Sequence, residues 1–260
     1  MLRPGSSLSG GPGDAATLKP GLRRRVLAEV RWSFSRPWTW LTGVGLNLAL
    51  SLLWLIWVPL RGHSHGDWVI LVGTYFAVFV LADVTTTNVL GLDATRVRIS
   101  MARGVPVRRI LVTKNLALLV IVGLPTLLLT AVLTARSETA HRLVLTLPGV
   151  ALPILAWLGV GNVVSVLLPV ASMPLLQRWR KRRRIGFTAR WLAHLGLPYV
   201  LLYAVDPVGD TPGLLVRLLP RPWRGAETLG LVVTLFAVAI WVAGTVLADR
   251  IVRCRGLPLR

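Results

Sequence analysis

The sequence predicts an all-α integral membrane protein with six transmembrane helices, an N-terminal amphipathic interfacial helix and a short cytoplasmic helix between spans two and three. Long uncharged stretches alternate with charged loops, and a bilayer core of roughly 30 Å needs about 20 helical residues. The stretches are continuous runs of Leu, Val and Ala, unlike the alternating strands of a closed barrel. The six expected spans are Thr39–Leu60, Trp68–Ala82, Asn115–Thr134, Leu143–Leu168, Trp191–Val205 and Thr228–Ala248.

The basic residues predict the orientation. Of the 30 Lys and Arg residues, 24 lie in alternate loops and the two termini, and 6 lie in the remaining loops. By the positive-inside rule both termini are cytoplasmic. Attraction to anionic inner-leaflet lipid accounts for the net charge of +20. No nucleic-acid partner is expected, because the charge is divided among four membrane-proximal segments. Arg outnumbers Lys by 27 to 3, which favours a bacterial plasma (inner) membrane protein.

The same reading divides the chain into four parts. Residues 1–20 are rich in Gly, Ser and Pro and are expected to be a disordered cytoplasmic tail. Residues 21–38 place apolar side chains at helical spacing among arginines, which predicts an amphipathic helix on the cytoplasmic surface; an unstructured polybasic flank is the alternative. Residues 39–250 form the six-span domain, and residues 251–260 form a cytoplasmic tail.

The segment between spans two and three is unusually polar. Thr85, Thr86, Thr87 and Asn88 continue the second span, and polar groups at that depth normally face protein or water. A helix end that has simply left the membrane is an equal alternative. Residues 96–105 then predict a short cytoplasmic helix, closed by Gly104 and Pro106, that suits docking into a cleft of a soluble partner.

The fourth uncharged stretch, residues 143–177, is longer than a bilayer requires and contains four prolines. Gly159, Gly161, Asn162 and Ser165 allow close helix approach and hydrogen bonds across it. We expect a kinked span in the interior or on a translocation path, with a packing seam as the alternative. The candidate residues for such a path or seam are Thr86, Asn88, Asn162 and Ser165.

Two further features fall in the last third of the chain. Residues 206–227 contain four prolines and predict a re-entrant or surface-lying hairpin on the outer side. His194 lies near the cytoplasmic start of the fifth span, where helix packing or an interfacial hydrogen bond is a better prediction than a proton relay.

Two motifs occur within these polar stretches. The first is Asn88-Val-Leu-Gly91-Leu-Asp93, before a loop in which Pro106 is followed by basic residues and by Leu111-Val-Thr-Lys114. The second is Gly159-Val-Gly161-Asn162-Val-Val-Ser165-Val-Leu-Leu-Pro169. With the six-span layout, they resemble the membrane subunits of ABC-2-type transporters, and the likeness covers roughly half of the chain.

The resemblance implies a transmembrane permease subunit of an exporter. Such subunits pair as homo- or heterodimers and work with separate ABC-type ATPase subunits, which hold ATP and Mg²⁺ and move the spans through short inner-loop helices. The implied ATPase-coupling loop comprises Gly91, Asp93, Arg96, Arg98, Arg103, Pro106, Arg108 and Arg109. The outer loops are too short for the large extracellular domain of some relatives, and nothing identifies the cargo.

The residues themselves argue against catalysis by this chain. A phosphate-binding loop needs Gly-x-x-x-x-Gly-Lys-Ser/Thr, but Lys19, Lys114 and Lys181 are followed by Pro, Asn and Arg. No catalytic residues or bound cofactor are expected. His63 and His65 lack a third ligand nearby, so no metal site is expected either. The alternative class is a six-span scaffold or accessory/regulatory protein without a transport path.

Overall fold

The computed structural model describes residues 21–35, 87–137, 139–170, 185–207 and 209–257, and these ranges contain helices and turns without a strand. The all-α class is confirmed for this part of the chain. The first two expected spans, the tail 1–20 and Thr86 lie outside the described residues. The prediction of six spans therefore stays a prediction.

Three helices are long and apolar enough to cross a membrane. The first joins α6 (Val107–Leu118), a π turn η2 (Leu119–Gly123) and α7 (Leu124–Ser137). The others are α8 (Leu143–Leu167), reached through the short turn η3 (Ala140–Arg142), and α12 (Ala226–Arg255). They contain the expected third, fourth and sixth spans. The fifth expected span lies within α10 (Ile185–Val205), which is not among these three.

The π turn in the first of these helices has a local cause. Pro125 comes two residues after the π turn, and a proline has no N–H for the carbonyl four residues earlier and clashes with it. That carbonyl belongs to Ile121, inside the π turn. A wider turn at this point relieves the clash while the helix continues, which is a common use of a single π turn.

Helices α8 and α12 pack most closely, because glycines face each other along their contact. A Cβ added to Gly159 would lie 2.5 Å from the carbonyl oxygen of Ile240, and one added to Gly244 would meet the carbonyl of Gly159. Asn162 Nδ2 donates to Thr245 Oγ1 at 2.9 Å across the same contact. Small residues with an occasional polar bond are typical of helix pairs in membranes.

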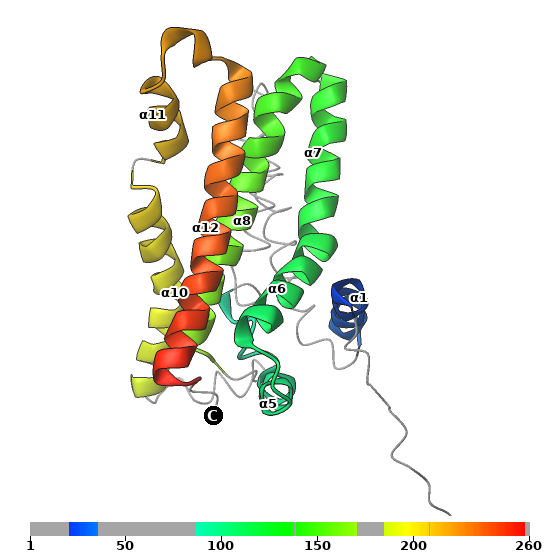
Figure 1. Ribbon diagram of the computed structural model, residues 1–260, viewed down its shortest axis with the longest axis vertical. Helices are drawn as coiled ribbons and strands as arrows, with labels where there is room; N and C mark the ends of the chain where they lie inside the picture. Colours follow the sequence, from blue (N-terminus) through cyan, green and yellow to red (C-terminus); the bar gives the residue numbers. More distant parts are fainter. Residues whose placement is uncertain (1–20, 36–86, 138, 171–184, 208, 258–260) are drawn as a thin grey trace, which may run out of the picture.

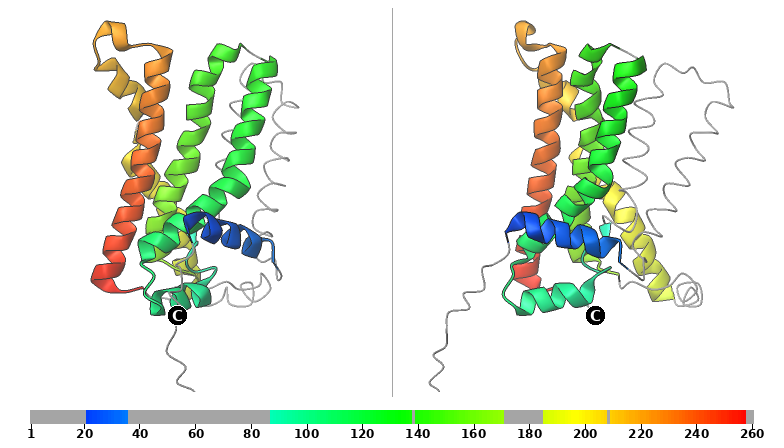
Figure 2. Two further views of the ribbon diagram at one scale, coloured as in Figure 1. Left: turned by 45° about the vertical axis from the view of Figure 1, so that its right-hand side comes forward. Right: turned by 90° about the vertical axis from the view of Figure 1, so that its right-hand side faces the viewer.

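Two short helices lie across one end of the long helices. These are α1 (Leu22–Ser33) and α5 (Ala94–Ala102), and Figures 1 and 2 place both at the end where α12 terminates. The starts of α6 and α10 lie at the same end. The described arginines of α1, of α5 and the start of α6, and of the first turns of α10 therefore gather there. We call this end of the structure the basic end.

Helix α5 ends at Ala102, three residues before the end of the predicted segment, and Gly104 closes it. Gly104 adopts φ +74°, Val105 N–H donates to the carbonyl of Ser100 at 3.0 Å, and Gly104 N–H donates to that of Met101 at 2.9 Å. This pair of bonds is a Schellman motif, which satisfies the last carbonyls of a helix. Pro106 then caps the start of α6.

The segment after α10 was expected to form a separate hairpin, but it does not turn back at once. Helix α11 (Thr211–Arg217) follows α10 in the same general direction and packs on α12 (Figure 1). The chain reverses only at the following residues, which include the short turn η4 (Arg221–Trp223). Asp206 holds the start of α11, because its carboxylate accepts from Thr211 N at 3.0 Å and Thr211 Oγ1 at 2.6 Å.

The glycine contact predicts a position-specific effect of one added methyl group. Gly159→Ala should lower the free energy of unfolding by about 1–3 kcal/mol, because the new Cβ collides with the α12 backbone. Gly149→Ala in the same helix is the control, since its Cβ meets nothing within 4 Å. Thermal unfolding of both variants in detergent measures the difference, and equal melting temperatures would contradict the packing described here.

Candidate functional site

The candidate site lies at the basic end, where residues 87–93 meet α1, α5, α6, the end of α8 and the start of α10. The first part of it is a two-point contact made by Asn88. Asn88 Nδ2 donates to the carbonyl of Val170 at 2.6 Å, and Val170 N–H donates to Asn88 Oδ1 at 2.9 Å. The side chain is fully buried. One amide thus satisfies both backbone groups of a residue beyond the end of α8.

Adjacent residues extend this contact. Leu90 N–H donates to Ser165 Oγ at 2.8 Å, and a Cβ on Gly91 would lie 2.5 Å from the Val170 carbonyl oxygen. The two motifs recognised in the sequence are therefore in direct contact. Gly91 is required there because no larger residue fits between the two backbones. We call this contact between residues 87–91 and the end of α8 the seam. Ser165 and Asn88 lie in the seam, whereas Asn162 faces Thr245 on α12.

His194 brings α10 into the same seam. Its Nε2 lies 3.2 Å from Thr87 Oγ1, and its Nδ1 lies 3.0 Å from the carbonyl oxygen of Leu168. The ring is 1% exposed. One ring nitrogen thus contacts the segment 87–93 and the other contacts the end of α8, as expected of a packing histidine. Arg190 Nη2 adds a bond of 3.4 Å to the Pro169 carbonyl.

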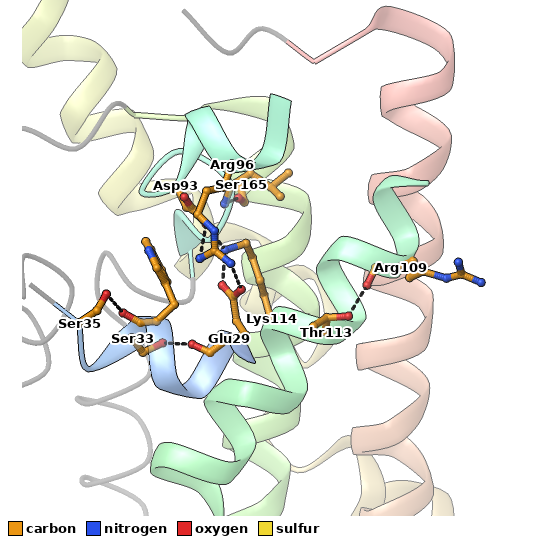
Figure 3. A network of polar contacts seen from close by, with 11 residues as sticks. Glu29, Ser33, Ser35, Asp93, Arg96, Arg109, Thr113, Lys114 and Ser165 are labelled. Atoms are coloured by element: carbon orange, nitrogen blue, oxygen red, sulfur yellow. Dashed lines mark hydrogen bonds and ion pairs between the residues drawn. The ribbon is translucent and has the colours of Figure 1, made fainter. Parts of the chain in front are cut away.

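The second part of the site is a cluster of four charges (Figure 3). Lys114 Nζ lies 2.5 Å from Glu29 Oε1 and 3.0 Å from Asp93 Oδ2. Arg96 bridges the same two carboxylates, at 3.0 Å from Glu29 and 3.2 Å from Asp93. The cluster joins α1 through Glu29, α5 through Arg96 and α6 through Lys114. Two positive and two negative charges balance within it.

Burial makes this pairing necessary. The side chains of Lys114, Glu29 and Asp93 are only 6–11% exposed. A charge that leaves water loses its hydration, and a nearby opposite charge with hydrogen bonds must replace it. Trp32 covers the cluster, with Arg96 Cζ 4.5 Å and Lys114 Nζ 5.1 Å from its ring centroid. These are cation–π distances, and the indole limits the access of water.

A third contact fixes the start of α6 against α12. Asp249 Oδ1 accepts from Arg108 N–H at 3.2 Å, and Asp249 also pairs with Arg253 at 2.7 Å. The first N–H groups of a helix lack intrahelical partners and favour negative charge. A carboxylate from α12 supplies that partner here.

The structure divides the predicted coupling residues into two groups. Gly91, Asp93 and Arg96 belong to the internal contacts, while Pro106 caps α6. The remaining residues have exposed side chains: Arg98 lies on α5, Arg103 directly follows it, and Arg108 and Arg109 lie in the first turn of α6. Helix α5 itself begins two residues before the predicted start, at Ala94.

Three site residues were missed by the sequence reading, namely Glu29, Trp32 and Asp249, whereas His194 was expected to pack against helices or to form a hydrogen bond. A signal existed for Glu29, because it is the only acidic residue of an arginine-rich helix and lies three residues after the apolar Val26, on the same side of the helix. Lys114 was noticed only as part of a motif. Its partners could not be inferred from spacing.

Among the residues described, the arrangement connects helices through hydrogen bonds and ion pairs. The described residues contain no group of three or more His, Cys, Asp or Glu that could hold a metal ion. The polar atoms of the seam and of the charge cluster mostly bind one another. These buried polar contacts therefore hold α1, α5, α6 and the end of α8 to one another.

Comparison of the chain with protein-family models, curated proteins and solved structures found no match.

The charge cluster predicts a specific coupling between α1 and α6. Glu29→Gln should cost about 1–3 kcal/mol of unfolding free energy, less than the 3–5 kcal/mol of a fully broken buried pair, because Asp93 still faces Lys114. The variant should also speed trypsin cleavage within α1. Exposed Glu227→Gln is the matched control and should do neither.

A double-mutant cycle of Glu29→Gln with Lys114→Gln separates the pair from other effects of each change. The two effects should be clearly non-additive. Additive free energies would show that the two side chains do not interact.

The seam predicts that two buried serines differ in their contribution to the free energy of unfolding. Ser165→Ala should destabilise the protein by about 1–3 kcal/mol, because it leaves the buried Leu90 N–H without an acceptor. Ser33→Ala is the control: its hydroxyl donates to the Glu29 carbonyl four residues earlier in the same helix. Chemical denaturation of both variants in detergent tests this, and a loss as large for Ser33→Ala would contradict it.

Proposed function

We propose that this chain is the membrane-spanning permease subunit of an ATP-driven, ABC-2-like exporter. The observation that carries the proposal is the position of α5. This short helix lies across the basic end, outside the long helices. It is tied to α6 by the ion pair of Asp93, the residue before it, with Lys114, and to α1 by the ion pair of Arg96 with Glu29. An element with that geometry suits the transfer of force from a soluble motor to the membrane spans.

The two faces of α5 support this role. Its inner face is anchored by Val97, which is 1% exposed and packs with Leu111 of α6 and Val252 of α12. Its outer face presents Thr95, Arg98, Ile99 and Ala102 to solvent. A partner that pushes on the outer face would move α6 directly, and α8 through the seam of residues 87–91.

The energy would come from a separate ABC-type ATPase subunit that holds ATP and Mg²⁺, because the 260 residues contain no phosphate-binding loop. In the proposed cycle, nucleotide-bound ATPases close, α5 moves, and the spans of a homo- or heterodimer of permeases open to alternate sides. The basic end would face the cytoplasm of a bacterial cell, with the long helices in the plasma membrane.

Copurification distinguishes this function from that of a six-span scaffold or accessory protein. The chain is expressed with and without the product of a neighbouring ATPase gene, and the hydrolysis rate is measured in proteoliposomes. A permease should bind the ATPase and change its rate. The exporter proposal would be contradicted if the ATPase does not bind, or if its hydrolysis rate is the same with and without this chain.

The outer face of α5 predicts a variant that separates assembly from folding. Arg98→Glu should weaken ATPase binding about tenfold or more, because a reversed charge now opposes the partner's complementary surface. Yield and membrane insertion should not change, since Arg98 is exposed. Arg250→Glu is the matched control: it also reverses an exposed arginine at the basic end, but on α12.

The measurements are the amount of copurified ATPase and the stimulated hydrolysis rate. If both variants behave alike, α5 is not the contact.

A further inference from the structure

A cleft of about 630 Å³ opens between α1, α5 and α6, beside the charge cluster. Its volume lies within the range of small-ligand sites. Its cationic lining residues are Arg25, Arg96, Arg103, Arg109 and Lys114. Val97 and Ile110 contribute apolar walls, and Ser100 contributes a hydroxyl. The cleft therefore combines a cationic lining with room for a ligand.

The charges of the cleft do not cancel. Its two carboxylates, Glu29 and Asp93, are already paired with Arg96 and Lys114. Two further arginines, Arg103 and Arg109, carry the excess charge. Arg103 and Arg109 are exposed and form no ion pair with another described residue, and Figure 3 shows the Arg109 side chain directed away from the charge cluster. The cleft thus presents uncompensated positive charge and fits an anionic ligand.

The surroundings of the cleft indicate where that anion comes from. Leu22, Leu27 and Phe34, in or next to α1, are 47–53% exposed, beside the arginines of the same helix. A helix with apolar and basic faces of this kind lies in the headgroup layer of a membrane. With α1 in that layer, the cleft that α1 bounds would open near the lipid phosphates. Acyl chains can then cover the exposed apolar residues nearby.

We infer that the α1–α5–α6 cleft binds the phosphate of an anionic phospholipid headgroup. Arg103 and Arg109 supply charge at the rim, Arg96 offers its remaining N–H donors, and Ser100 adds a neutral donor. Guanidinium groups bind phosphate oxygens through paired hydrogen bonds. The bound lipid bridges α1, α5 and α6 and restrains α5. The inference depends on the membrane location of α1 and goes beyond the transport proposal.

Native mass spectrometry of the purified full chain in dodecyl maltoside tests this site. The protein is titrated with the anionic lipid dioleoylphosphatidylglycerol and, separately, with the zwitterionic lipid dioleoylphosphatidylcholine. The wild type should retain phosphatidylglycerol at least tenfold more tightly. Arg103→Gln with Arg109→Gln should weaken that binding roughly 10- to 30-fold, as expected for two charges near an anionic phosphate.

Two further variants control for net charge and folding. Arg250→Gln with Arg255→Gln removes the same charge from exposed positions on α12, outside the cleft, and should bind as the wild type does. Arg103→Lys with Arg109→Lys keeps the charge and should retain the preference for phosphatidylglycerol. Equal weakening by both glutamine pairs, or no preference in the wild type, would overturn the inference.

Two other outcomes would assign the cleft to a different ligand and also overturn the inference. Complete displacement of phosphatidylglycerol by low-millimolar inorganic phosphate would identify a soluble phosphate as the ligand. Unchanged lipid binding together with lost ATPase binding in the Arg103/Arg109 glutamine variant would make the cleft a protein contact. Neither outcome alters the test of the transport proposal, which uses Arg98.

Discussion

The buried charge of Lys114 is the constraint on which the basic end of this protein depends. Lys114 sits near the start of a long apolar helix with 9% of its side chain exposed. Its ammonium needs anionic partners there, because buried charges are tolerated only when paired. Glu29 and Asp93 supply them from α1 and from the residue before α5. One buried cation therefore fixes where both surface helices lie.

The remaining contacts connect the charge cluster to the other long helices. Asn88 and Ser165 hold residues 87–91 against the end of α8, and Asp249 holds the start of α6 against α12. Glycine contacts then join α8 and α12 over much of their length. No element of the basic end stands alone. These contacts are the physical basis for the two proposals made above. In the first, α5 transfers force to the long helices, and in the second, a lipid in the cleft restrains α5.

Local patterns in the sequence predicted much of the fold. Apolar runs predicted α8 and α12, and Gly104 with Pro106 predicted where α5 ends. Pairings between distant residues were not predictable. Lys114 and Glu29 are 85 positions apart, and nothing in a single sequence selects these two among 30 basic and 10 acidic residues. The contact between the two motifs was missed for the same reason. The direction of α11 depends on its packing against α12, which the prolines of its segment do not specify.

Pulsed electron paramagnetic resonance tests most directly whether α1 and α5 are held as one unit. Spin labels at Leu27→Cys and Ile99→Cys, both exposed positions, report the distance between the helices once the exposed Cys254 is replaced by serine. The account predicts a single narrow distance distribution in liposomes that becomes broad when Glu29 is changed to glutamine. A broad distribution with Glu29 intact, or a narrow one unaffected by its loss, would contradict the account.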